Sequence, residues 1–202
     1  MDNNKIKLGS DAVVQRLVGA MSVGGQLHPQ SAVSALGCLA GYACQADIRS
    51  KYIITAKMAV EDVFEVFSDR SGKHYYFGEL TDKLLIGDGY SLWGMLSRVS
   101  SELPDINEIL GYVSSAAGSD SFGNVRSVKV GDTMQSYLKM LWAPMSALAM
   151  QYCEVGELHI VFGAALTKML MAFTRQNTDG KELVRISMES AVSMSRVNIS
   201  EI

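Results

Sequence analysis

The sequence has little charge and little proline, and it shows no excess of basic residues. Only 19% of its 202 residues are charged, with 18 Lys and Arg against 21 Asp and Glu, and 3 are proline. A chain without a basic excess is a poor candidate for general nucleic-acid binding, which needs a positive face. Because 48% of the residues are hydrophobic, the composition also excludes a disordered chain. We therefore expect one well-packed domain over residues 1–202.

Cysteine is scarce as well, and apolar runs of membrane-spanning length are missing. Cys38, Cys44 and Cys153 form an odd set without regular spacing, which is typical of small buried side chains in a reducing compartment. The first residues lack the apolar segment of a secretory signal, and no later stretch offers the ~20 apolar residues of a transmembrane helix. The sequence thus predicts a cytoplasmic protein without a membrane partner.

Familiar catalytic motifs are absent too. The chain contains no phosphate-binding GxxxxGK[ST] motif, no GxGxxG after a strand and no GxSxG nucleophile elbow. Its histidines, His28, His74 and His159, have no second His or Cys at the spacing of a zinc half-site. We therefore predict no catalytic residue and no cofactor.

What the sequence does contain is helical periodicity along most of its length. Apolar residues recur at helical spacing in segments that predict a mainly α fold of about seven to nine helices. The first helix is expected to begin at Ser10–Asp11, and Pro144 is expected to kink or break a later apolar helix over about 132–153. The last segment, about 181–197, is expected to be amphipathic.

One predicted helix, over about 29–47, is apolar on nearly every side, which indicates that it is buried. Gly37 and Gly41 lie one turn apart in it and lower its helix propensity. Two missing side chains on one face let a neighbouring backbone approach. The pair therefore predicts a close helix crossing.

A single β-hairpin is expected near residues 62–77. Runs of β-forming residues at 63–67 and 73–77 flank the turn-forming segment 69–72. The preceding residues 53–62 fit either a helix or the lead into the first strand, and the sequence leaves this open. An isolated hairpin is marginally stable, so one face should pack against the helices.

Two charge-poor regions point to association as the function. Residues 8–48 hold three charged side chains and residues 133–173 hold four, which is more apolar helix than a small domain readily hides. We therefore expect a homo-oligomer that also binds a protein partner, a non-enzymatic interaction protein. The candidate partner or ligand surface combines acidic, aromatic and histidine side chains: Glu61, Glu65, His74, Tyr76, Tyr90 and Trp93.

Two alternatives remain open. Twelve methionines, together with the aromatic residues, are compatible with a small-molecule binding protein that has a Met- and aromatic-lined cavity. The acid pairs Glu154/Glu157 and Asp179/Glu182 distantly resemble the ExxE and ExxD motifs of all-α nucleotide pyrophosphohydrolases, with the second motif reversed. That resemblance implies a magnesium-dependent phosphate hydrolase with these four residues as the metal candidates.

Overall fold

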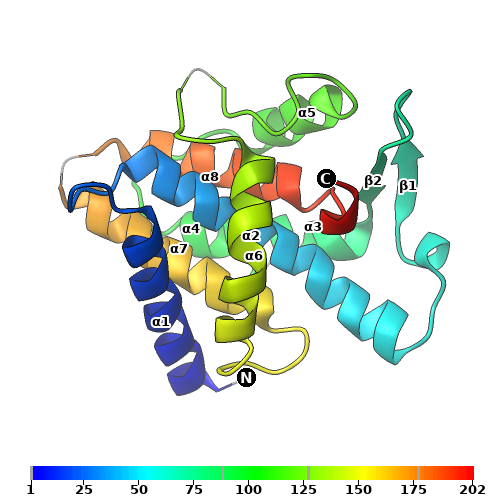
Figure 1. Cartoon of the computed structure of the whole chain (residues 1–202), viewed down its shortest axis with the longest axis horizontal. Coiled ribbons are helices and arrows are strands. Elements are labelled where there is room, and N and C mark those ends of the chain that lie inside the picture. The colour runs from blue at the N-terminus through cyan, green and yellow to red at the C-terminus, as the bar shows by residue number, and fades with distance from the viewer. Residues whose placement is uncertain (1, 88, 127, 177) are drawn as a thin grey trace.

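A computed structural model describes residues 2–87, 89–126, 128–176 and 178–202, and it confirms the mainly α fold with one hairpin (Figure 1). The helices are α1 (Asn3–Met21), α2 (Pro29–Ile48), α3 (Glu79–Ile86), α4 (Leu92–Leu96), α5 (Ile106–Ala116), α6 (Met134–Ala149), α7 (Leu158–Thr174) and α8 (Gly180–Met194). The strands are β1 (Glu65–Ser68) and β2 (His74–Phe77). Three short turns of helix complete the described elements: η1 (Arg49–Thr55), η2 (Val60–Asp62) and η3 (Ile199–Glu201).

Helix α2 lies in the middle of the molecule, packed by α1, α6, α7 and α8 (Figure 1). Its side chains are buried along almost its whole length. This burial takes place within one copy of the chain, so the apolar character of α2 needs no second copy to cover it. Among the described residues, no helix combines the length and apolar character that crossing a bilayer requires.

The crossing of α2 and α8 depends on small side chains. A Cβ atom on Gly37 would lie 2.5 Å from the Ser187 carbonyl oxygen, and one on Gly41 would overlap the backbone of Ala191. The Ser34 and Ser190 hydroxyl groups meet across the same crossing at 2.9 Å. Helix α8 is amphipathic, as expected, and because α2 and α5 both pack against it, it is also buried along most of its length.

A network of ion pairs around a buried carboxylate attaches the loop that follows α5 to helix α8. The fully buried Glu189 carboxylate accepts hydrogen bonds from Arg126 Nε at 2.6 Å and Arg185 Nη1 at 2.7 Å. It also accepts from the Arg126 backbone N–H at 3.1 Å. Two arginines on one buried carboxylate compensate for its lost hydration.

The first helix begins earlier than the sequence indicated. Helix α1 starts at Asn3 because the Asp2 carboxylate accepts hydrogen bonds from the N–H groups of Asn4 (2.9 Å) and Lys5 (3.3 Å). Ser10 is buried inside the helix and donates to the Lys7 carbonyl at 2.9 Å. The expected start at Ser10–Asp11 is therefore wrong.

Pro144 does not break α6, which runs from Met134 to Ala149. Proline removes the hydrogen bond to the carbonyl four residues earlier, which belongs to Met140. Both Pro144 and Met140 are exposed, so this side of α6 faces water. Water can therefore take the role of the missing N–H and form a hydrogen bond with the Met140 carbonyl. An exposed position therefore tolerates a proline that a buried one would not.

The hairpin forms as predicted, with β1 and β2 antiparallel and Glu65 opposite Phe77. Its turn is held by the Asp69 carboxylate, which accepts from the N–H groups of Ser71 at 2.8 Å and Lys73 at 3.1 Å. The segment that the sequence left open is the end of η1, a π-helix that continues α2, followed by the 3₁₀ turn η2.

Candidate functional site

Four of the six candidate surface residues lie at the hairpin, but they differ in exposure. Glu61 and Glu65 are exposed, and exposed His74 lies 3.2 Å from the Glu201 carboxylate through Nδ1. Tyr76 is buried and donates its hydroxyl hydrogen bond to Glu201 at 2.7 Å. Burial, reinforced by Glu201, raises the pKa of Tyr76. Tyr76 thus packs the C-terminal segment onto the hairpin and offers no surface for a partner.

The other two candidates lie elsewhere in the molecule. Tyr90 is exposed and lines a groove with Ile6 of α1 and Ile160 of α7. Trp93, on α4, is half-buried and packs against the core. The six residues predicted from the sequence therefore do not form one continuous surface.

Two arginines that the sequence analysis did not single out hold β2 in place. The Arg49 guanidinium lies over the Tyr76 ring, 4.4 Å from its centre. Arg196 is buried, donates to Asp82 at 2.5 Å and accepts the Tyr76 backbone N–H on its carbonyl at 2.8 Å. Strand β2 is thus the inner strand of the hairpin, and β1 is the outer one.

The outer edge of β1 is open. The Asp69 N–H donates to the Lys73 carbonyl at 3.0 Å, so Asp69 and Lys73 form a hydrogen-bonded pair. Because such pairs alternate in an antiparallel ladder, the backbone groups of Val66 and Ser68 point away from β2. Among the described residues neither has a backbone partner outside the hairpin. All four residues of β1 are exposed, and β1 lies at the right-hand margin of Figure 1.

The surroundings of this edge are apolar and acidic. Val66 and Phe67 are exposed, at 39% and 51%. The nearby acids Glu61, Asp62 and Glu65 are also exposed and have no ion-pair partner in the described part of the chain. Phe67 also lines a cavity of about 520 Å³ between the hairpin turn and residues 117–120.

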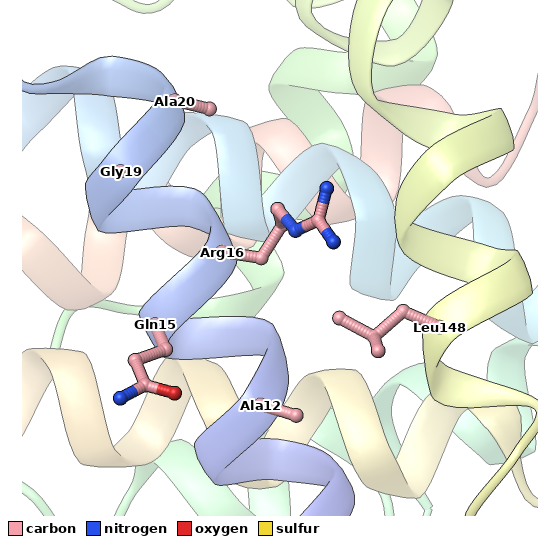
Figure 2. Close-up of a pocket in the computed structure, with 6 residues that line it drawn as sticks. All are labelled: Ala12, Gln15, Arg16, Gly19, Ala20 and Leu148. Atoms are coloured by element: carbon pink, nitrogen blue, oxygen red, sulfur yellow. The ribbon is translucent and has the colours of Figure 1, made fainter.

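A second surface feature is a groove of about 630 Å³ between α1 and α6, shown in Figure 2. Its α1 wall carries small residues, Ala12, Gly19 and Ala20. The Arg16 side chain reaches toward α6, and Leu148 points back toward α1 (Figure 2). Arg16 has no carboxylate partner among the described residues, so the groove is apolar with one available cation.

The four metal candidates are not brought together. Glu154 and Glu157 precede α7, whereas Asp179 caps α8 beyond the other end of α7. A helix of 17 residues spans about 25 Å. Glu182 pairs with Arg185 at 2.6 Å. The described residues include no group of three or more His, Cys, Asp or Glu arranged to hold a metal ion.

A buried carboxylate that the sequence analysis did not single out joins α2 to α7. Asp47 Oδ2 accepts from the His159 N–H at 2.8 Å and lies 2.7 Å from His159 Nδ1, while Oδ1 accepts from the Leu158 N–H at 3.3 Å. Asp47 thus caps the N-terminus of α7 from another helix. The only sequence signal is an isolated acid in an otherwise uncharged helix.

The chain matches no protein-family model, no curated protein and no solved structure. The case for a function therefore depends on the geometry of the described residues. Two features carry it: an open strand edge beside acidic side chains, and a groove between α1 and α6.

Proposed function

We propose that this protein is an interaction protein that binds an extended segment of a partner by strand addition to β1. The observation that carries the proposal is the open edge, where the backbone N–H and C=O groups of Val66 and Ser68 have no partner outside the hairpin among the described residues. An added antiparallel strand would form hydrogen bonds with both residues, which is a common mode of peptide recognition.

The surroundings of the edge select the partner's chemistry. Glu61, Asp62 and Glu65 favour lysine or arginine on the incoming strand. Val66 and Phe67 are exposed and point to opposite faces of the hairpin, so they favour apolar residues on both faces of the incoming strand. A second copy is a poorer fit, because symmetric pairing about Phe67 would place Glu65 opposite Asp69 of the other copy, and like charges directly opposite are destabilising.

A peptide selection tests this proposal. We expect peptides that combine apolar residues with lysine or arginine to be selected from a random library by the wild-type protein. Val66→Pro removes an outward N–H that does not belong to the β1–β2 ladder, and should weaken binding of the selected peptides about tenfold or more. Val66→Thr keeps the N–H and serves as the matched control, with affinity close to wild type.

Hydrogen exchange then locates the bound peptide. The amides of Val66 and Ser68 should exchange rapidly in the free protein and become protected in the complex. Equal binding to Val66→Pro, or protection confined to another part of the molecule, would contradict strand addition. Failure to select any peptide would contradict it as well.

The groove of Figure 2 supports a second candidate function, self-association of two copies through α1 and α6. Its lining of small and apolar residues permits close packing of a second helix pair. We expect a dimer at micromolar concentration by native mass spectrometry, and dissociation on Ala12→Arg, which places a second cation in the groove. The matched control is Ser114→Arg, at an exposed position of α5. A wild-type monomer would refute this candidate.

A further inference from the structure

A recessed cavity of about 290 Å³ lies where α2 ends, α6 ends and the chain turns into α7. Helix α6 contributes Trp142 and Ser146, and α2 contributes Asp47. Met150, Cys153 and Glu154, on the segment that links α6 to α7, close the remaining sides. The cavity shares no residue with the open edge of β1 or with the groove of Figure 2.

The indole of Trp142 forms a fixed aromatic wall. It meets the Tyr42 ring edge-on with centres 4.5 Å apart, and the Phe162 ring with centres 6.0 Å apart. Met150, about two turns further along α6 at its C-terminal end, is 59% exposed and flexible enough to fit different apolar groups. Tryptophan is also the aromatic side chain that attracts cations most strongly.

The charged groups of the cavity are acidic. Asp47 is buried, and its Oδ1 has one hydrogen bond of 3.3 Å, which leaves capacity to accept another. Glu154 is exposed at the rim. Of the described residues that line the cavity, none is lysine or arginine. Burial, together with the carboxylates of Asp47 and Glu157, raises the pKa of Cys153 to about 11, as expected for an apolar site of negative potential.

Two lysines nearby belong to a different cavity. Lys51 and Lys83 line a smaller space of about 200 Å³ that shares Asp47 with the first. Lys83 pairs with Glu79 at 2.8 Å, and the Lys51 ammonium lies 5.4 Å from the centre of the Tyr52 ring. Neither lysine is among the residues that line the Trp142 cavity.

We infer that this cavity binds a small organic cation, an amine or quaternary ammonium group attached to a short apolar or aromatic group. The positive group would lie near Asp47 and Glu154, and the apolar part would pack against Trp142 and Met150. The volume of about 290 Å³ is at the lower end of the range of ligand pockets, which excludes molecules of nucleotide size. This ligand site is independent of strand addition at β1, and either proposal can fail alone.

Benzylamine is a suitable probe, with benzyl alcohol and benzoate as neutral and anionic analogues of similar shape. The chain has two tryptophans, so Trp93→Phe leaves Trp142 as the only tryptophan reporter. We expect benzylamine to quench Trp142 fluorescence saturably at neutral pH. Benzyl alcohol should bind about tenfold more weakly, and benzoate should not bind.

Substitutions of residues that line the cavity test whether benzylamine binds there. Ala46→Leu fills the cavity and should abolish quenching, whereas Ala147→Leu, at an exposed position of α6 outside it, should leave binding unchanged. Glu154→Gln changes only a rim side chain and should weaken benzylamine about two- to fivefold without affecting benzyl alcohol. This variant keeps the test decisive if Ala46→Leu does not fold.

Three results would overturn the inference. One is the absence of saturable quenching by benzylamine. Another is equal affinity for benzylamine, benzyl alcohol and benzoate, because a site without charge selection is not a cation site. The third is benzylamine affinity that survives both Ala46→Leu and Glu154→Gln.

Discussion

Replacing Gly41 with alanine should destabilise the protein, although alanine is the better helix former. In an exposed helix this change stabilises by up to about 1 kcal/mol. At Gly41 the new Cβ would overlap the backbone of Ala191 in α8. A backbone cannot rotate away as a flexible side chain can. The two helices must therefore separate, and the Ser34–Ser190 hydrogen bond at their crossing must lengthen.

The expected cost follows from these terms. Overpacking a core costs about 1–3 kcal/mol, and a backbone obstacle places this site at the upper end of that range. Weakening a buried hydrogen bond adds about 1 kcal/mol. After subtraction of the helix-propensity gain, we expect a net loss of about 2–3 kcal/mol in the free energy of unfolding. For a chain of this length, that corresponds to a fall of about 4–12 °C in Tm.

Urea unfolding followed by circular dichroism measures this loss, with Gly111→Ala as the matched control. A Cβ on Gly111, inside α5, would meet nothing within 4 Å, so the same substitution should raise stability by up to about 1 kcal/mol there. The two variants should shift in opposite directions. If Gly41→Ala also stabilised the protein, the close crossing of α2 and α8 would be refuted.

Three further predictions concern polar groups that are buried or half-buried. Glu189→Gln should lower the free energy of unfolding in urea by about 3 kcal/mol, because two half-buried arginines lose the charge of the buried carboxylate that they share. Glu102, whose ion pair is exposed, should tolerate the same change within about 0.5 kcal/mol, and equal effects of the two substitutions would contradict the network. Asp47→Ala should lower the free energy of unfolding by about 2–3 kcal/mol and speed hydrogen exchange of the His159 amide. An unchanged exchange rate at His159 would exclude the role of Asp47 as the cap of α7. Burial raises the pKa of Cys153 from 9.0 to about 11, so its contribution to stability is complete below pH 9 and is lost as the pH rises toward 11; a urea midpoint with the same pH dependence in Cys153→Ala would refute this.

Local patterns were enough to predict most elements of the fold. The hairpin was predictable because its turn is stabilised within the turn itself, by Asp69. The burial of α2 was predictable because apolar residues cover nearly every side of this helix. The start of α1 was missed because Asp2 caps a polar first turn, and apolar periodicity begins only at Ile6. Burial of α8 could not be inferred, because its serines are covered by the glycine face of a helix far away in the sequence.

The candidate sites depended even more on long-range contacts. The sequence identified the hairpin as a surface, yet it could not distinguish the inner strand from the outer one. That distinction arises from Arg196, near the C-terminus, whose carbonyl accepts a hydrogen bond from the Tyr76 N–H. The acid pairs looked equivalent in sequence, and only the length of α7 between them shows that they lie apart. Asp47 became significant only when α7 was placed on it.

The same contacts that stabilise β2 explain why β1 is both ordered and open. A two-stranded hairpin alone is marginally stable in water, so its order must come from packing against other elements. Here β2 provides this packing. Its Tyr76 donates its backbone N–H to the Arg196 carbonyl and its hydroxyl group to the Glu201 carboxylate, and the Arg49 guanidinium lies over the Tyr76 ring. Strand β1 is held through its ladder with β2, and its outer backbone groups take no part in that stability. The fold does not need this edge, so it is available to the partner strand that we propose, and we expect the acids beside it to favour a basic partner.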